Sequence, residues 1–240
     1  MTTSSLELLL GQLDGALQVE GERVTVANEA KLREKIDHLI HEAVFAEGVE
    51  RELARWLIWE AGQALNIYPA SIHELYLAIG RGEAPQTFTV PAMNIRGMNF
   101  NTSRAAFRAA NKLNVGAMLF EIARSEIGYT DQRPSEYVAA LIAAAIKEGY
   151  RGPLFVQGDH FQLSLKNYTS DAHKEVNAVK ELMKEAIDAG FYNIDIDTST
   201  LVDLGPETLD EQQRINYELC GQLTEYVREI EPEGVTVSLG

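Results

Sequence analysis

Cysteine is almost absent from this sequence of 240 residues, with Cys220 as the single example. One thiol cannot form a disulfide within the chain, so a disulfide framework is excluded. Sparse cysteine is typical of proteins kept in a reducing compartment, and we therefore expect a cytoplasmic protein. Cys220 lies in a helical pattern, which indicates a small packing residue rather than a nucleophile.

Long apolar runs and a basic leader are missing as well. The longest apolar stretches, such as residues 138–146, are far shorter than the ~20 residues that a membrane helix needs. No Lys or Arg precedes the leucines at positions 6–10, as a secretory signal would require. We therefore expect neither a secretory signal nor a membrane partner.

Positive charge is scarce, because 36 acidic residues stand against 21 basic ones and the net charge is −15. A protein of that charge repels a phosphate backbone, so we expect no nucleic-acid partner. A small phosphorylated substrate is not excluded, since a local group of N–H donors and cations is enough to hold a phosphate.

The first third of the chain is dominated by helical periodicity, with almost no strand signal. Amphipathic patterns cover residues 6–13, 30–46, 49–65 and 71–79, and Ser71 stands three residues before Glu74 in a capping-box pattern. The chain is long enough for one large domain, or for a domain with a helical annex. We predict that residues 1–84 form an all-helical region for packing or oligomerisation, and that the protein is a homo-oligomer.

Three histidines lie in this helical region. His38 and His41 are three residues apart and share a helix face, but no Cys or carboxylate stands near them at a zinc-like spacing. His73 falls in the first turn of a predicted helix. We therefore do not expect His38 and His41 to be metal ligands, and we interpret His73 as a surface residue of that first turn.

After the break at residues 80–85, strands and helices alternate. Apolar runs predict strands at 88–93, 117–122, 153–156, 192–196 and 235–239, and helical patterns lie between them at 102–113, 135–148, 174–189 and 209–229. This alternation is typical of βαβ units and a parallel sheet. We therefore predict an α/β domain over residues 85–240.

The stretch at residues 153–160 is the centre of this domain. An apolar run leads into Gly158, and Asp159 and His160 follow directly at the predicted strand end, where parallel α/β folds place their chemistry. The pair also has an ordinary interpretation, in which Asp159 caps a helix and His160 is a polar loop residue.

Polar side chains also end the neighbouring strands, at Asn94 and at Asp195 and Asp197. In a (β/α)8 TIM barrel the ends of consecutive strands converge on one mouth. A doubly wound sheet would carry a glycine-rich phosphate loop after its first strand, and residues 94–98 do not match that motif. The sequence therefore favours a TIM barrel, represented here by about its first five strands.

Four motifs of this region resemble a known family, the class II, metal-dependent fructose-bisphosphate (ketose-bisphosphate) aldolases. Residues 90–94 (VPAMN) are similar to the first strand of that family, and residues 157–160 (QGDH) to its third strand. The EAIDAGF and DIDTS segments within residues 185–199 resemble its fourth strand, and residues 235–240 its fifth. The resemblance covers residues 86–240, and the order and spacing of the motifs add to its specificity.

The resemblance implies a lyase of carbohydrate metabolism and glycolysis. Such an enzyme uses a divalent metal, usually Zn²⁺, to cleave a phosphorylated sugar, a ketose bisphosphate, into two triose phosphates. By this resemblance His160 is a metal ligand, Asp197 lies near the metal, and Asp195 is a further candidate there. Asp159 is the catalytic general acid and base, and Asn94 lines the substrate pocket.

The sequence also departs from the family pattern. Ala123 stands where the second strand often carries a substrate-contacting Ser, and the loop at 161–173 is longer and more polar. The chain ends at Gly240, before the positions that supply the remaining metal ligands and the phosphate site in this family. We therefore expect an N-terminal part of a longer aldolase-like protein, which by itself lacks aldolase activity and binds zinc weakly.

Two other functions remain open. One is a non-catalytic barrel subunit or assembly protein, with the acidic helical region as its interface. The other is a barrel lyase that uses a Schiff-base lysine, although none of the five predicted strands contains Lys. Borohydride trapping with substrate separates this second alternative from the metal-dependent reaction.

Overall fold

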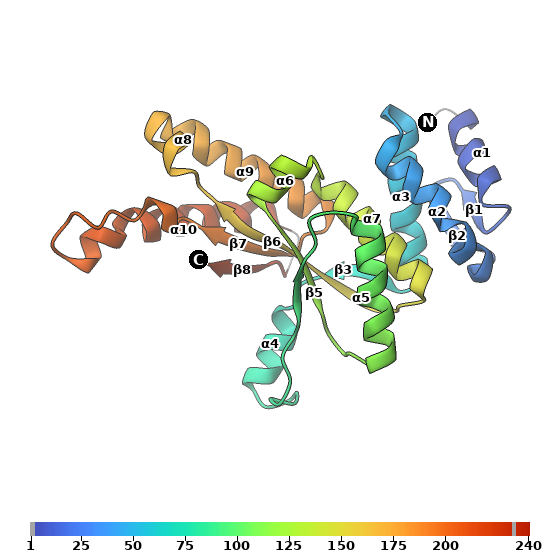
Figure 1. Cartoon of the computed structure of the whole chain (residues 1–240), viewed down its shortest axis with the longest axis horizontal. Helices are drawn as coiled ribbons and strands as arrows, with labels where there is room; N and C mark the ends of the chain where they lie inside the picture. Colours follow the sequence, from blue (N-terminus) through green and yellow to red (C-terminus); the bar gives the residue numbers. More distant parts are fainter. Residues whose placement is uncertain (1–2, 232–233) are drawn as a thin grey trace. The chain divides into compact units, whose positions relative to one another are not determined.

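The computed structural model describes residues 3–231 and 234–240 (Figure 1). Its described residues fall into two compact units that alternate along the chain. Unit 1 comprises Met1–Pro69, Ile95–Met118 and Gln132–Leu154, and unit 2 comprises Ala70–Asn94, Leu119–Asp131 and Phe155–Gly240. Each predicted domain, 1–84 and 85–240, thus contributes residues to both units, and the boundary at residue 84 stays a prediction.

Unit 1 is built mainly from helices. They are α1 (Thr3–Gln12), α2 (Glu29–Phe45), α3 (Gly48–Ala64), α5 (Asn99–Leu113) and α7 (Pro134–Glu148). The Asn28 side chain begins α2 by accepting a hydrogen bond from the Lys31 amide at 3.0 Å. Helices α2, α3 and α5 all pack on α7, in which an unbroken run of side chains from Tyr137 to Ile146 is buried. A helix that is apolar on all sides is typical of a core element.

Three short strands show that residues 1–84 are not all-helical as predicted. β1 (Leu17–Glu20) and β2 (Arg23–Val26) form an antiparallel hairpin, and β3 (Ile67–Ala70) pairs with β6. The hairpin loop has Gly21 at φ +64°, which suits a two-residue turn. Strands of four residues carry too little alternation to stand out within a helical context, and this explains the error.

Unit 2 contains parallel strands in the order β4-β5-β6-β7-β8, of which Figure 1 labels β5 to β8. These are β4 (Ala92–Asn94), β5 (Leu119–Ala123), the part of β6 (Gly152–Gln162) from Phe155 onward, β7 (Asn193–Asp197) and β8 (Thr236–Leu239). Each successive pair is parallel. All residues of β7 are buried, as expected for a strand covered on both faces. The structure thus confirms the predicted α/β class with a parallel sheet.

Helices flank the strands of unit 2. They are α4 (His73–Gly80), α6 (Arg124–Thr130), α8 (Leu165–Ser170), α9 (Ala172–Ala189) and α10 (Leu209–Ile230), with a 3₁₀ turn at Ser199–Leu201. Helix α10 packs against α9 and β7. Asp171 caps the N-terminus of α9, and Gly190 ends that helix with φ +103°. None of the helices within the described ranges is long and apolar enough to cross a bilayer.

Several predicted boundaries differ from the observed ones. The first strand covers only Ala92–Asn94, because Phe88 and its neighbours lie in an exposed loop. Residues 161–173 include the short helix α8, and α6 follows β5 without a loop. Ser71 does not form the predicted capping box, since Ile72 is the N-cap of α4 and Ser71 Oγ accepts from the His73 amide at 3.2 Å.

Candidate functional site

The central strand β6 carries Asp159 and His160 within the strand, not after it as predicted. Its pairing with β7 shifts register between Gly158 and Phe161, so the pair occupies an irregular segment. Phe161 is fully buried, and its ring would lie 2.5 Å from a Cβ at position 158, which requires glycine there. His160 takes φ +43°, a left-handed conformation that costs energy for a residue with a side chain. The His160 side chain is 62% exposed.

Three carboxylates surround the His160 imidazole. Asp159 Oδ2 lies 3.8 Å from Nε2, while Asp195 Oδ2 and Asp197 Oδ2 lie 3.6 and 3.4 Å from Nδ1. The ligand atoms of Asp159, His160 and Asp195 all lie within 4.8 Å of one another, a grouping that could hold a metal ion. Asp195 therefore belongs to the three-residue group that could hold a metal ion. Asp197 lies close to one member of that group, His160.

Asp195 and Asp197 are fixed by hydrogen bonds from neighbouring strands and loops. Ser238 Oγ on β8 donates to Asp195 Oδ1 at 2.6 Å, and the His160 amide donates to Asp195 Oδ2 at 3.2 Å. Ser199 donates to Asp197 Oδ1 through its amide at 3.0 Å and its hydroxyl at 2.6 Å. Burial opposes ionisation of Asp197, but the bonds from Ser199 and Gln162 outweigh it and lower the pKa of this carboxyl.

Asp159 and Glu121 have the opposite electrostatic environment. Burial raises the pKa of Asp159 above its ordinary value, and the charges of Asp195 and Glu126 raise it further, although His160 acts in the other direction. Burial also raises the pKa of Glu121 on β5, with Asp159 as the largest charged contributor. The site therefore combines a carboxyl that stays ionised at lower pH, Asp197, with two that retain a proton to higher pH.

Asn94 ends β4 and is connected to the site through Glu126. Its amide donates to Glu126 Oε2 at 2.8 Å, and the same oxygen accepts the Ala123 amide at 2.9 Å. Glu126 is 8% exposed, so Asn94 and the end of β5 share a buried carboxylate. The structure thus places Asn94 on the same sheet as Asp159, His160 and Asp197, all in unit 2.

Sequence reasoning missed Glu121 and Glu126. Glu121 gave a signal, because it is an acid in the middle of the apolar run of β5. Glu126 belongs to α6, which was not predicted, so its approach to Asn94 had no sequence signal.

The donor set consists of one imidazole and several carboxylates, which suits zinc, iron or manganese better than a soft metal. Chemically, such a group can bind a divalent cation and carry a proton on a neighbouring carboxyl. No protein-family model matches the chain, and no curated protein matches it significantly.

Proposed function

We propose that this chain carries the metal site of a metal-dependent lyase that catalyses aldol cleavage and condensation of a ketose bisphosphate, with two triose phosphates as the products of cleavage. The observation that carries the proposal is the position of His160 between the carboxylates of Asp159 and Asp195. The resemblance of residues 86–240 to class II aldolases supports the choice of reaction.

The proposed architecture is a (β/α)8 barrel in which β4 to β8 are consecutive strands. Their parallel order supports it, as do the helices between them. Asn94 and Asp197 are the last residues of their strands, and Asp159 and His160 lie near the end of β6. Active sites of this fold lie at the carboxyl ends of the strands.

The residues present fit a divalent cation, with Zn²⁺ as the expected ion. His160 offers an imidazole nitrogen and Asp195 a carboxylate oxygen, both common ligands of such ions. One ring nitrogen of His160 would bind the cation, and the other would keep a carboxylate partner that orients the ring. A cation would also offset the negative charge of the surrounding acids.

When bound, the divalent cation supplies a Lewis acid that polarises a ketone carbonyl. Asp159 holds and moves the proton: it gives it to the aldehyde-derived oxygen in condensation and takes it back in cleavage. The raised pKa of Asp159 suits this role, because a general acid works best when its pKa approaches the working pH. Asp197 stays ionised and faces the same ring nitrogen of His160, Nδ1, as Asp195 does. Asn94, held by Glu126, lines the substrate pocket.

The test measures metal binding and catalysis separately. EDTA-treated protein is titrated with Zn²⁺ by calorimetry, and fructose 1,6-bisphosphate cleavage is assayed before and after zinc is returned. We expect His160→Ala and Asp195→Asn to weaken zinc binding, and Asp159→Asn to remove any cleavage that the unmodified chain shows. His41→Ala is the matched control, because it removes an exposed imidazole from unit 1. Zinc binding that survives His160→Ala contradicts the proposal, and cleavage that is indifferent to EDTA favours the Schiff-base lysine.

One observation favours a second candidate, a non-catalytic barrel subunit. The site carries the carboxyls of Glu121, Glu126, Asp159, Asp195 and Asp197 near a single imidazole, and such a charge opposes binding of an anionic bisphosphate. The discriminating result is loss of oligomers when Phe45 and Val49 are replaced, while His160→Ala leaves the oligomers intact. These two side chains of α2 and α3 are apolar and exposed.

A further inference from the structure

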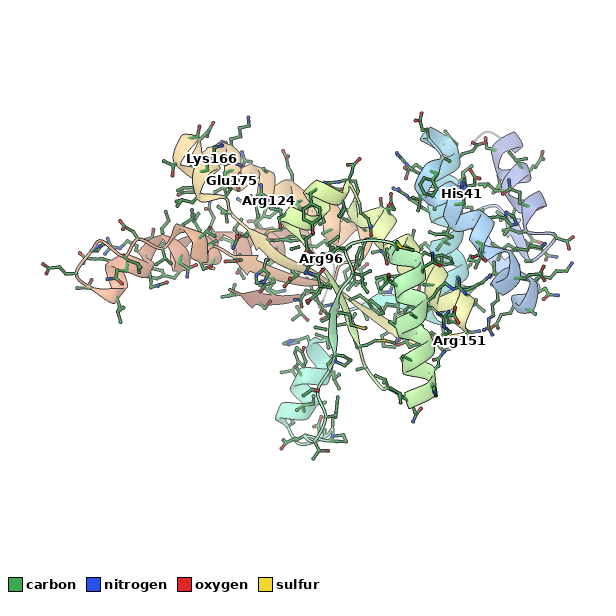
Figure 2. The ribbon with its side chains drawn as sticks, viewed as in Figure 1. His41, Arg96, Arg124, Arg151, Lys166 and Glu175 are labelled. Atoms are coloured by element: carbon green, nitrogen blue, oxygen red, sulfur yellow. The ribbon has the colours of Figure 1, made fainter. Side chains whose placement is uncertain are left out.

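Arg124 connects the start of α6 with the end of β6 and with α9. Its Nη1 donates to the Gln162 carbonyl oxygen at 2.7 Å and lies 2.5 Å from Glu175 Oε1. Figure 2 labels both side chains of this ion pair, Arg124 on α6 and Glu175 on α9. The Glu175 side chain is only 3% exposed, so the pair is largely withdrawn from water.

Glu175 is bound by three partners, although it is a buried acid. Besides Arg124, the Ser164 amide donates to Oε1 at 2.7 Å and Asn167 Nδ2 donates to Oε2 at 3.2 Å. Burial opposes ionisation, but the bonds from Arg124 and Ser164 outweigh it and lower the pKa of Glu175. The ionised carboxylate of Glu175 therefore links α9 to three other parts of unit 2, namely α6, α8 and the segment between β6 and α8.

The segment that this pair holds leads directly to the candidate site. Gln162 Nε2 donates to Asp197 Oδ2 at 2.6 Å, and the Leu163 amide donates to the Asp197 carbonyl oxygen at 3.1 Å. Asp197 Oδ2 in turn lies 3.4 Å from His160 Nδ1. A displacement of Gln162 would thus alter the carboxylate that faces the imidazole.

We propose that Arg124 and Glu175 are positioning residues that hold the end of β6, so that His160 and Asp197 keep the geometry of the candidate metal site. A buried ion pair adds little net stability, because desolvation of both charges offsets their attraction. The strand end they hold contains the irregular Gly158–Phe161 step and the left-handed His160, which need support from outside the strand. The metal part of this inference rests on the proposed function.

The first test needs no metal. In the EDTA-treated protein, hydrogen exchange is measured for the amides of residues 160–164, which include the donors to Asp195, Asp197 and Glu175. We expect Glu175→Gln and Arg124→Lys to speed exchange there about tenfold, with little change in α10. Asp188→Asn is the matched control, because it removes one acidic charge from the exposed end of the same helix α9. Unchanged exchange at 160–164 overturns the inference.

The second test uses Co²⁺ as a spectroscopic probe of the site. Residues that orient metal ligands typically contribute about 10- to 100-fold to metal affinity, and we expect Glu175→Gln to weaken Co²⁺ binding by that factor and to shift its visible spectrum. Arg124→Lys keeps the charge on a shorter side chain, so it should retain more affinity than Arg124→Gln. The inference is overturned if a variant loses Co²⁺ affinity only as much as its free energy of unfolding falls, and if the spectrum of its bound Co²⁺ is unchanged.

A double variant guards against simple unfolding. Arg124→Gln leaves the Glu175 carboxylate buried without its cation, whereas Arg124→Gln combined with Glu175→Gln removes both charges together. If this double variant folds and exchanges like the unmodified protein at residues 160–164, the positioning role is wrong. If the unmodified protein binds no Co²⁺ but the exchange effect is present, the proposed function fails and the positioning of the strand end stands.

Discussion

The two units bury different kinds of polar side chain. In the described part of unit 1 the buried polar residues are the uncharged Asn99, Ser103 and Gln132. In the described part of unit 2 they include four carboxylates, those of Glu126, Glu175, Asp195 and Asp197. Burying a carboxylate costs free energy unless donors or cations compensate, so an acid-rich interior is not explained by stability alone.

In the described part of unit 1, the charged pair of Arg55 and Glu136 lies at the edge of the core, with 13% and 19% of the two side chains exposed. Arg55 donates to the Ala43 carbonyl oxygen at 2.9 Å and to Ser135 Oγ at 2.7 Å, so it joins α2, α3 and α7 at a partly buried edge. Apolar packing of the helices remains the main source of stability there. The difference indicates that unit 1 stabilises the fold and that unit 2 contains the groups whose environments are suited to chemistry.

The largest expected effect is a loss of packing in unit 1. Leu57 on α3 is fully buried, and Leu57→Ala should lower the free energy of unfolding by about 3 kcal/mol through lost burial and a cavity. Leu8→Ala is the matched control: the same substitution on α1, where 55% of the leucine is exposed, should change stability by no more than about 0.5 kcal/mol. Thermal and urea unfolding measure both. Equal effects of the two variants would remove the distinction between core and surface in unit 1.

A smaller effect belongs to unit 2 and depends on metal. Zinc at about 100 times its Kd should raise the free energy of unfolding by about 2.7 kcal/mol, because only the folded chain presents the assembled site. In Asp195→Asn an affinity loss of about a hundredfold would leave only about 0.4 kcal/mol of stabilisation at the same zinc concentration. Asp188→Asn serves as the control. Zinc that stabilises Asp195→Asn as much as the unmodified protein would argue against a site at the strand ends.

Substitution of two helical glycines, one in each unit, allows the packing of the two units to be compared. A Cβ on Gly62 of α3 would lie 2.6 Å from Ile142 Cγ2 and 3.0 Å from the Ile67 carbonyl oxygen, so Gly62→Ala should destabilise unit 1 by about 1–3 kcal/mol. A Cβ on Gly221 of α10 would meet nothing within 4 Å, so Gly221→Ala should stabilise the protein by up to about 1 kcal/mol. Unfolding curves decide the signs. A stabilising Gly62→Ala would mean that α3 and α7 are less tightly packed than described.

Long periodic segments of the fold were predictable from the sequence. The patterns at 30–46, 49–65 and 135–148 correspond to α2, α3 and α7 within one or two residues, and the apolar run at 192–196 corresponds to β7. Short elements were not predictable: β1 and β2 have four residues each, and their pairing depends on a turn at Gly21. The course of β6 through His160 depends on packing of Phe161 against Gly158, which no local pattern reveals.

Candidate-site residues that are adjacent in the sequence were predictable. Residues that only folding brings together were less predictable. Asp159 and His160 were selected because they are adjacent after an apolar run. Asp195 Oδ2 lies 3.6 Å from His160 Nδ1, where the pairing of β6 with β7 shifts register, and strand-end spacing in the sequence does not reveal this distance. Arg124 and Glu175 lie 51 positions apart, and their pairing requires the helices α6 and α9 to be placed first.

The smallest expected effect tests whether the acids of unit 2 destabilise the folded state. Burial and the charge of Asp159 raise the pKa of Glu121 above its ordinary value of 4.5, so the folded state disfavours the ionised carboxyl. For an acid with a raised pKa, stability is lost as the pH rises from the ordinary value through the folded value. Glu121→Gln cannot ionise, and it should therefore gain stability relative to the unmodified protein as the pH increases from about 4.5 to neutrality.

Thermal melts of both proteins in EDTA, recorded across that pH range, measure the difference. Glu225→Gln on the exposed face of α10 removes the same charge away from the site, and its effect should not follow this pH profile. A difference between Glu121→Gln and the unmodified protein that stays constant with pH would show that Glu121 is not destabilised by its surroundings. The acid-rich strand ends would then impose no cost on folding, and the contrast between the two units would reduce to one of composition.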